Sequence, residues 1–332
     1  MSEDTARKIK WGIISTGWIA SQFVRDLTHS KTGVAYAVGS RSQESADEFA
    51  QKFGMPKAYA TYEELVNDPE VEAVYIGTPH PFHKDNALLA LRAGKAVLCE
   101  KPFTVNSGEL EEVVAYAREH KLFLMEAMWS RYIPAIVKVR EWIASGRIGD
   151  VRLVKADLSF RTDWNPQGRL LNPELGGGAL LDVGIYPISF ASMVFGPHPE
   201  KIQSTAHIGE TGVDEHFSML LSYSGGKAAS LNAGVRLKTL EEAHVFGTEG
   251  YIIVEGTLVN PKSASLYIGD EKVETFEDDR ISIGYNFEAD EVGRCLQEGL
   301  TESPVMPLDE SLALLKLLDQ VRAQWGLVYP GE

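Results

Sequence analysis

The stretch that decides the fold is Trp11-Gly12-Ile13-Ile14-Ser15-Thr16-Gly17-Trp18-Ile19-Ala20. An apolar run leads into a short turn, and the turn leads into a segment with helical periodicity. Ser15, Gly17 and Ala20 fall on the three positions of the glycine fingerprint that holds the pyrophosphate of a dinucleotide. The middle glycine lets the backbone approach the phosphates, alanine is accepted at the third position, and Ser15 can keep a tight turn. We therefore expect a dinucleotide site at a helix amino terminus.

The first 128 residues alternate short apolar runs with amphipathic stretches, which is typical of a parallel sheet with crossover helices. The expected strands are 10–15, 34–40, 57–59, 71–77, 96–99 and 122–127. The expected helices are 17–27, 43–53, 62–67, 82–92 and 107–119. Right-handed crossovers make this a doubly wound α/β domain, to which we assign residues 1–130.

The pattern changes in residues 131–332, which we assign to a second domain. Residues 219–223 and 229–235 alternate apolar and polar side chains on either side of Gly225-Gly226, which indicates a β-hairpin. Similar stretches at 151–160, 201–209, 242–247 and 251–255 predict an α+β domain with a large, mostly antiparallel sheet. Helices 134–144, 286–298 and 308–324 are expected on one face. A face left uncovered needs a partner, so we expect a homodimer or higher homo-oligomer.

Length and composition agree with two packed domains and exclude some partners. The chain has 332 residues and a formal net charge of -15, which repels nucleic acid and anionic membranes. The polar start and the short apolar run at 11–14 do not form a signal peptide, and no later run approaches a membrane span. We expect a soluble cytoplasmic protein whose two cysteines, Cys99 and Cys295, are free thiols.

The end of the second expected strand, Val38-Gly39-Ser40-Arg41-Ser42, bears on the choice of cofactor. An acidic residue here would bind the ribose 2′-hydroxyl of NAD, whereas an arginine with serines suits the 2′-phosphate of NADP. The sequence therefore predicts NADP over NAD. The alternative is that Arg41 is a solvated loop residue.

Thr78, His80 and His83 follow the fourth expected strand, at the same edge of the sheet. Two histidines three residues apart lie on one helix face and can suggest a metal. Because the sequence offers no obvious third ligand, we expect no metal site, and cofactor contact or helix capping remains.

Lys101 ends the apolar run 96–99 and is flanked by Glu100 and Pro102. A cation at the carboxyl end of a buried strand lies where ligands bind in open α/β sheets. In the second half, Gly176-Gly177-Gly178 runs into an apolar helix that carries Asp182 and Tyr186 one turn apart on one face. Pro187 costs about 3 kcal/mol inside a helix, so this helix is expected to start late or to kink. These residues alone also allow a structural role, with a capping aspartate and a core tyrosine.

The combination of these motifs, in this order, resembles the Gfo/Idh/MocA family of oxidoreductases. The resemblance is closest to the dimeric dihydrodiol dehydrogenase branch, which includes NADP-dependent D-xylose dehydrogenases. It rests on the amino-terminal turn and on the segments 77–84, 97–102, 125–131, 176–186 and 302–307. The resemblance implies a Rossmann domain followed by a substrate-binding and dimerisation domain.

The resemblance also implies roles for individual residues. Lys101 would contact the nicotinamide ribose and the substrate oxygen, Asp182 would position the substrate, and Tyr186 would transfer the proton. Tyr75 matches a position implicated in coenzyme contact. The expected cofactor-binding residues are Ser15, Thr16, Gly17, Trp18, Ile19, Ser40, Arg41, Thr78, His80, His83, Glu100 and Lys101. The expected substrate-binding residues are Trp129, Arg131, Phe160, Arg169, Asp182 and Tyr186.

The chemistry of these residues suits hydride transfer with a nicotinamide cofactor. A base must remove the hydroxyl proton while hydride leaves the carbon. The ordinary pKa of tyrosine, near 10, is about three units above neutral pH, so ionising the hydroxyl at pH 7 costs roughly 4 kcal/mol. An adjacent ammonium such as Lys101 would lower that pKa. We expect an NADP-dependent dehydrogenase or reductase acting on a sugar or cyclic polyol, most simply an aldose such as xylose or glucose. The alternatives are a dihydrodiol dehydrogenase, a dicarbonyl or anhydrofructose reductase, and a non-catalytic dinucleotide-binding regulator.

Overall fold

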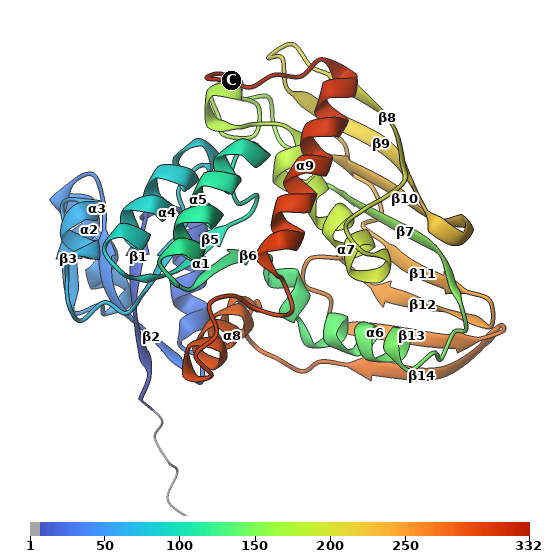
Figure 1. The fold of residues 1–332 in the computed structure, drawn as a ribbon, viewed down its shortest axis with the longest axis horizontal. Coiled ribbons are helices and arrows are strands. Elements are labelled where there is room, and N and C mark those ends of the chain that lie inside the picture. The colour runs from blue at the N-terminus through green and yellow to red at the C-terminus, as the bar shows by residue number, and fades with distance from the viewer. Residues whose placement is uncertain (1–6) are drawn as a thin grey trace, which may run out of the picture. The chain divides into compact units, whose positions relative to one another are not determined.

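The computed structural model describes residues 7–332, and contacts within the chain divide it into two units (Figure 1). Unit 1 contains the residues up to Thr104, then Gly108–Trp129 and Ile281–Ser311. Unit 2 contains Val105–Ser107, Ser130–Arg280 and Leu312–Glu332. The assignment of functional domains to 1–130 and 131–332 stays a prediction, and the return of Ile281–Ser311 to unit 1 was not part of it.

Unit 1 is built on a six-stranded parallel sheet, which confirms the predicted doubly wound fold. The strand order is β3-β2-β1-β4-β5-β6. Their bounds are Ile9–Ile14 for β1, Gly33–Gly39 for β2, Lys57–Tyr59 for β3, Ala73–Ile76 for β4, Ala96–Glu100 for β5 and Leu124–Ala127 for β6. The order reverses between β1 and β4, and ligands of such sheets bind outside the carboxyl ends of the strands at this switch point.

Helices follow the strands of unit 1 in the predicted order. They are α1 (Trp18–Leu27), α2 (Gln43–Phe53), α3 (Tyr62–Val66), α4 (His83–Arg92) and α5 (Ser107–Glu119). Each predicted element is present, with its ends shifted by at most two residues. Aromatic packing fixes α1 on the sheet, because Phe23 stacks on Tyr75 of β4 with ring centroids 3.8 Å apart.

Helix α8, Tyr285–Gln297, also belongs to unit 1 and packs on α1 and β2. The buried carboxylate of Asp26 caps it by accepting hydrogen bonds from the N–H groups of Ile283, Gly284 and Tyr285 at 3.2, 2.6 and 2.9 Å. The expectation that helix 286–298 covers the antiparallel sheet is therefore wrong. Its periodicity predicted a helix with one apolar face, but not which sheet that face would cover.

Unit 2 is built on an eight-stranded, mostly antiparallel sheet, as predicted. The order is β14-β13-β12-β11-β7-β10-β9-β8, and of its neighbouring pairs β7 and β10 are parallel. The bounds are Val151–Ser159 for β7, Lys201–Ile208 for β8, Asp214–Tyr223 for β9, Lys227–Gly234 for β10, Ala243–Gly247 for β11, Gly250–Glu255 for β12, Ser263–Ile268 for β13 and Glu271–Glu277 for β14.

The predicted β9–β10 hairpin is present. Gly225 and Gly226 turn it with φ of 71° and 73°, which glycine adopts without strain. Strands β13 and β14 were not predicted from the sequence. β14 is an edge strand with mostly exposed side chains, so its sequence carries little apolar alternation.

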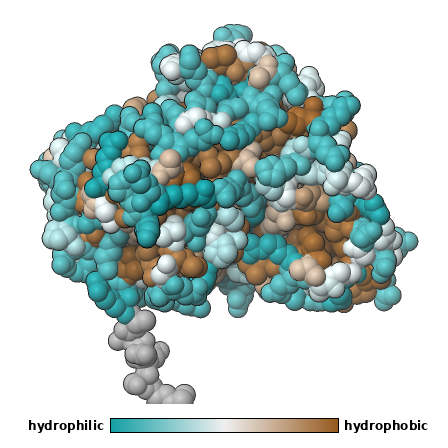
Figure 2. Space-filling view, in the orientation of Figure 1, coloured by the Kyte–Doolittle hydropathy of each residue, from teal (hydrophilic) through white to brown (hydrophobic). Residues whose placement is uncertain are grey.

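Three helices accompany this sheet: α6 (Pro134–Ala144), α7 (Ile185–Phe195) and α9 (Leu308–Trp325), whose residues from Leu312 onward belong to unit 2. Helix α6 packs on β12, β13 and β14, and α7 on β7 and β10 (Figure 1). Figure 2 shows hydrophobic residues gathered over the part of unit 2 where β11 and β12 lie.

The stretch Pro173–Phe195 in unit 2 is long and apolar enough to cross a membrane by length and composition alone. The expectation that no run approaches a membrane span is wrong by this measure. The segment is 83% buried inside the protein, and the core helix of a folded domain passes the same test.

Candidate active site

The dinucleotide turn lies between β1 and α1, where the sequence predicted it. Ser15 adopts a φ of 125°, a region that favours glycine and costs other residues about 1–3 kcal/mol. Its Oγ accepts a hydrogen bond from the Gly17 N–H at 3.0 Å, which closes the turn. Ser15 thus takes a glycine-like conformation at the first fingerprint position.

The surroundings of Gly17 fit a pyrophosphate. A Cβ added to Gly17 would have one neighbour within 4 Å, the Oγ of Ser15 at 3.2 Å, so the backbone is open to a ligand on that side. Thr16 and Ile19 are partly exposed, and Trp18, the first residue of α1, is 72% exposed. Amide N–H groups at an open helix amino terminus bind phosphate, so the residues present fit the diphosphate of a dinucleotide.

After the end of β2, Arg41 lies between Ser40 and Ser42, and each serine makes a hydrogen bond to another part of unit 1. Ser40 is buried and its N–H donates to the Tyr59 carbonyl at 3.1 Å, while the Ser42 Oγ caps α2 by accepting from the Ser45 N–H at 3.3 Å. The Arg41 side chain is exposed. Arg41 is thus an exposed cation just after β2, and the choice of NADP stays a prediction.

Lys101 lies directly after β5, in a turn held by the Glu100 carboxylate. Glu100 is buried; its Oε2 accepts from the Lys101 backbone N–H at 3.1 Å, and its Oε1 accepts from the Tyr75 hydroxyl at 2.6 Å. Tyr75 is fully buried, and burial raises the pKa of its hydroxyl well above the ordinary value, so it stays a donor. Tyr75, which matched a coenzyme-contact position, therefore lies inside the core and acts on the Lys101 turn through Glu100.

His83 supports the same turn from inside the protein. The imidazole is fully buried, with Nδ1 3.0 Å from the Pro102 carbonyl oxygen and Nε2 2.8 Å from that of Thr78. Burial lowers the pKa of His83, although the two carbonyl contacts oppose that shift. The neutral ring bridges the two strand ends that carry Thr78 and Lys101, donating from one nitrogen.

The other predicted cofactor residues of this edge are close together. The Thr78 Oγ1 accepts from the Asn86 amide at 3.1 Å, and the buried His80 ring lies 5.7 Å from the His83 ring, centroid to centroid. In the described part of the chain, residues 7–332, no group of three or more His, Cys, Asp and Glu side chains is placed to hold a metal ion.

Two buried carboxyl groups of unit 1 were not among the predicted site residues. The Glu126 Oε1 accepts from the Phe103 N–H at 3.2 Å, and its Oε2 accepts from the Ser311 hydroxyl at 2.6 Å, so it also anchors the chain after Lys101. Neither carboxyl oxygen of Glu288 has a hydrogen-bond partner within the described residues. Burial, followed by the charges of Glu100 and Asp26, raises the pKa of Glu288 well above the ordinary value, because each of them disfavours the ionised form. The hydrogen bond between Ser311 and Glu126 spans 185 positions, and the burial of Glu288 is likewise a product of the folded chain, so the sequence carries no signal for either.

In unit 2, Asp182 and Tyr186 lie one turn apart, as predicted. Asp182 is in a π-helical turn, Leu180–Gly184, that continues directly into α7. Pro187 is the third residue of α7, so the expected irregularity takes the form of a wide turn just before the proline, which has no N–H to donate. Gly184 makes the turn possible, because a Cβ there would meet the Phe217 ring at 2.5 Å.

Both side chains are largely buried, with Asp182 5% and Tyr186 7% exposed. The Asp182 Oδ1 accepts from the Arg169 Nη1 at 2.6 Å, and the Arg169 side chain is 52% exposed. Arg169, predicted to bind substrate, therefore contacts the predicted substrate-positioning carboxylate.

The remaining predicted substrate residues are held by different elements. Arg131 donates from Nε and Nη2 to the hydroxyl and carbonyl of Ser189 at 2.9 and 2.8 Å, which ties it to α7. Phe160, directly after β7, donates its N–H to the Gly234 carbonyl at 3.0 Å. Trp129 belongs to unit 1, where its ring stacks on Tyr285 with centroids 4.3 Å apart. Arg131 and Tyr186 line one small cavity together with Ser130, Ile136, Phe190, Met193 and Leu258.

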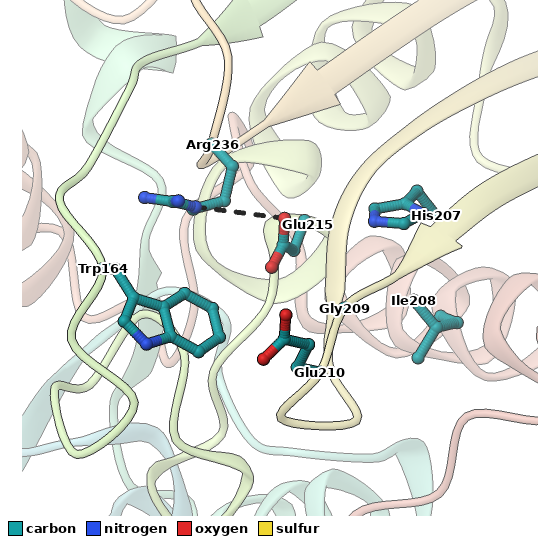
Figure 3. A pocket seen from close by; sticks show the side chains of 7 residues that line it. All are labelled: Trp164, His207, Ile208, Gly209, Glu210, Glu215 and Arg236. Carbon is teal, nitrogen blue, oxygen red and sulfur yellow. Dashed lines mark ion pairs between the residues drawn. The ribbon is translucent and has the colours of Figure 1, made fainter.

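A larger cavity of unit 2, about 610 Å³, lies at the ends of β8 and β10 (Figure 3). The Arg236 Nε is 3.9 Å from the Glu215 Oε2, and the Arg236 guanidinium lies 5.5 Å from the centre of the Trp164 ring. An aromatic ring beside charged and polar groups can bind a polyhydroxylated ring, and sequence reasoning did not single out this set. The lining residues are Trp164, His207, Ile208, Gly209, Glu210, Glu215 and Arg236.

Comparison with known proteins decides the family. The model of an oxidoreductase family with an NAD-binding Rossmann fold matches residues 9–128, and the Gfo/Idh/MocA C-terminal domain matches residues 136–253. The chain belongs to the Gfo/Idh/MocA oxidoreductase family. It is an NAD(P)-binding oxidoreductase, as the sequence predicted.

Individual relatives match over nearly the full length of this family member. It is 43% identical to mouse trans-1,2-dihydrobenzene-1,2-diol dehydrogenase and 42% identical to the human enzyme, covering 98% of this chain and 99% of each relative. A 3-ketoreductase from Actinomadura kijaniata, solved with NADP and TDP-benzene, superposes with a TM-score of 0.82 at 26% identity, covering 96% of this chain and 98% of that one. An aldose-aldose oxidoreductase from Caulobacter crescentus shares the fold, with a TM-score of 0.86 at 22% identity, covering 96% of this chain and 98% of that one.

Proposed function

We propose that the protein is an NADP-dependent dehydrogenase that exchanges hydride with the alcohol carbon of a cyclic polyol or sugar, with an aldose of the xylose or glucose type as first candidate. The observation that carries this proposal is the helical turn with Asp182 and Tyr186. A carboxylate held by Arg169 at 2.6 Å can accept hydrogen bonds from substrate hydroxyls, and a phenol one turn away can exchange a proton with the reacting oxygen.

The cofactor supplies the hydride acceptor at its nicotinamide carbon. The chain's own residues would do the rest. Tyr186 would take the proton of the reacting hydroxyl, and the Lys101 ammonium would stabilise the negative charge that develops on oxygen in the same reaction. Asp182 would orient the neighbouring hydroxyl of the substrate. This assignment gives each of the three polar side chains a role in the reaction.

NADP is proposed because the exposed Arg41 follows β2, where a carboxylate for NAD would lie. The matched variants are Arg41→Ala and Arg25→Ala, since Arg25 is also exposed and lies in α1. Arg41→Ala is expected to raise the KM for NADP about tenfold, because one charged contact to the 2′-phosphate is lost. The KM for NAD, which has no 2′-phosphate, is expected to stay unchanged. A wild-type kcat/KM for NAD equal to or above that for NADP would overturn this part.

A trans-dihydrodiol is the second candidate substrate. It is favoured by the 43% identity, over nearly the whole chain, to the mouse dihydrodiol dehydrogenase. Both candidates present adjacent hydroxyl groups on a ring, so the same Asp182 and Tyr186 could serve either.

Steady-state rates of NADP reduction with D-xylose, D-glucose, an inositol and trans-1,2-dihydrobenzene-1,2-diol test the proposal, beside NADPH oxidation with a dicarbonyl. The expected result is saturable turnover with at least one aldose or cyclic diol. If kcat/KM is highest with the dihydrodiol, then the dihydrodiol rather than an aldose is the substrate. Binding of NADPH without turnover of any compound would overturn the enzymatic proposal and favour a dinucleotide-binding regulator.

We also propose that the protein is a cytoplasmic homodimer. One face of the unit 2 sheet carries α6 and α7, and Tyr251 of β12 stacks on Tyr267 of β13 with ring centroids 4.5 Å apart. Aromatic side chains on a sheet are well suited to a subunit interface. Sedimentation equilibrium at micromolar concentration is expected to give twice the chain mass, and a monomer mass would count against the dimer.

A further inference from the structure

Asp214, the first residue of β9, is a fully buried carboxyl group at the start of the helix that carries Asp182 and Tyr186. Its Oδ2 accepts a hydrogen bond from the Leu180 N–H at 2.7 Å. Leu180 is the first residue of the π-helical turn, two residues before Asp182. The carboxyl group therefore contacts the backbone that determines where both candidate catalytic side chains lie.

The glycines before this helix are packed closely against Asp214. Gly178 has a φ of 117°, and a Cβ there would lie 2.3 Å from the Asp214 Oδ1 and 3.3 Å from the Tyr329 hydroxyl. The Tyr329 hydroxyl donates to the Gly177 carbonyl at 2.8 Å. Only glycine fits between β9 and the carboxy-terminal segment, so the start of the helix is fixed from two sides.

The charge of Asp214 does not serve stability. Burial raises the pKa of its carboxyl to about 7, although the backbone N–H groups of Leu180, Asp214 and Ala179 oppose the shift. An aspartate in the unfolded chain titrates near 3.9, so between about pH 4 and 7 the folded state binds more protons and stability falls as pH rises. An asparagine could accept the same Leu180 hydrogen bond without that penalty.

We propose that Asp214 is a positioning residue of this enzyme, whose carboxylate fixes the turn at Gly178–Leu180 and thereby the directions of Asp182 and Tyr186. The proposal rests on the proposed function of that pair. The ionised carboxylate makes a stronger hydrogen bond to an N–H than the protonated acid does. Protonation of Asp214 below neutral pH therefore weakens its hydrogen bond to the Leu180 N–H and loosens the helical turn that carries Asp182 and Tyr186.

Few titratable groups act on Asp214. The influences on its carboxyl are burial and backbone N–H groups, with no charged side chain among them in the described chain. Tyr329 is the ionisable group next to it, and burial and the Asp214 charge raise the pKa of its hydroxyl well above neutrality. Arg322 and Glu332 act on Tyr329 in turn. A transition near pH 7 in this cluster therefore belongs to Asp214.

The test compares Asp214→Asn and Asp214→Ala with Asp26→Asn, which alters another buried aspartate that caps a helix. Asp214→Ala is expected to lower kcat about thirtyfold, in line with the effect of small misplacements of catalytic groups. Asp214→Asn is expected to lower kcat by less, to remove the kcat transition near pH 7, and to melt no lower than wild type at pH 8. Asp26→Asn is expected to keep that transition. Asp214→Asn with wild-type kcat and an unchanged pH profile would overturn the proposal.

Hydrogen–deuterium exchange separates failure of this proposal from failure of the proposed function. Asp214→Ala is expected to speed amide exchange in residues 178–186 and leave residues 285–297 unchanged, and Asp26→Asn is expected to do the reverse. This readout needs no turnover, so it holds even if the wild-type protein oxidises none of the compounds offered. Unchanged exchange in 178–186 would show that Asp214 does not position the turn.

Discussion

The turn at Lys101 and the helical turn at Asp182 are held by different kinds of contact. Around Lys101, the imidazole of His83 bridges two backbone carbonyls and Glu100 binds a backbone N–H. At Asp182, the supports are charges: the guanidinium of Arg169 and the buried carboxyl of Asp214. Both regions carry candidate catalytic groups, and the second is supported by an ion pair that salt can screen and by a carboxyl group whose pKa is about 7.

This difference suggests a division of tasks between the two regions. A neutral imidazole with a lowered pKa does not titrate above its ordinary value, so the Lys101 turn stays fixed across the neutral range. A half-exposed ion pair is screened by salt, and a carboxyl with a pKa of about 7 changes charge in that range. We expect the region that serves a constant cofactor to be insensitive to conditions, and the substrate region to be tunable.

The largest effect on kcat is expected when the candidate reacting groups of the two regions are themselves replaced. Lys101→Met and Tyr186→Phe are each expected to lower kcat by about a hundredfold or more, because each removes a group needed for proton transfer or charge stabilisation. Stopped-flow hydride transfer and circular dichroism of the same samples check this. Near-normal turnover in Tyr186→Phe would remove that residue from the mechanism.

Replacing His83, the neutral side chain that supports the Lys101 turn, is expected to have the next largest effect on kcat. His83→Leu removes the imidazole that lies between the Thr78 and Pro102 carbonyls and leaves the carbonyl that accepts its N–H without that donor, so we expect a loss of about 2 kcal/mol in the free energy of unfolding and about a tenfold fall in kcat. Urea unfolding and steady-state kinetics measure the two effects.

His120→Leu is the matched control, because the exposed His120 ring contacts a single carbonyl, that of Tyr116 at 2.9 Å. It is expected to change neither quantity. If the two leucine variants behaved alike, the buried bridge at His83 would have no special role.

Replacing Arg169, the cation paired with Asp182, is expected to weaken substrate binding. Arg169→Met is expected to raise the substrate KM about fivefold, the equivalent of roughly 1 kcal/mol for a half-exposed pair. In the wild type, 0.5 M NaCl should reproduce part of that rise, and in Arg169→Met salt should have little further effect.

Arg152→Met is the control for this experiment, since Arg152 pairs with Asp150 at 2.9 Å in the same unit and is exposed. An equal rise in KM in both variants would indicate a general effect of surface charge rather than the Asp182 pair.

The smallest expected effect is in the dinucleotide turn. Ser15→Gly relieves the strain of a φ of 125° but loses the hydrogen bond to the Gly17 N–H, so we expect a net stabilisation of about 1 kcal/mol. Ser15→Ala keeps the strain and loses the bond, and should be less stable than wild type. Thermal melts measure both, and a Ser15→Gly variant that melts below wild type would contradict the strain argument.

Much of unit 1 could be predicted because its signals are local. A strand, a turn of defined composition and a helix follow one another within ten residues at Ser15 and Gly17, so the sequence contains the whole motif. Lys101 could be singled out for the same reason, as a cation at the end of an apolar run. Asp182 and Tyr186 needed a family resemblance, because their spacing alone also fits a buried cap and a core tyrosine.

The remaining features depend on contacts between residues distant in sequence. Asp214 reaches Leu180 across 34 positions, and Asp26 reaches Gly284 across 258. Helix α8 has the amphipathic pattern of any surface helix, and that pattern does not say which sheet it covers. Edge strand β14 has one apolar side chain on each face, Val273 and Phe276, so its sequence lacks the alternation that would predict a strand.

The return of Ile281–Ser311 to unit 1 has a consequence for how the protein can be made. The cap of α8 requires Asp26, so the dinucleotide-binding unit is complete only when both parts of the chain are present. A fragment that stops at residue 130 would expose the face of α1 and β2 that α8 covers. During synthesis, nearly the whole chain must leave the ribosome before this unit can reach its final packing, and the protein cannot be cut at residue 130 into two self-sufficient modules.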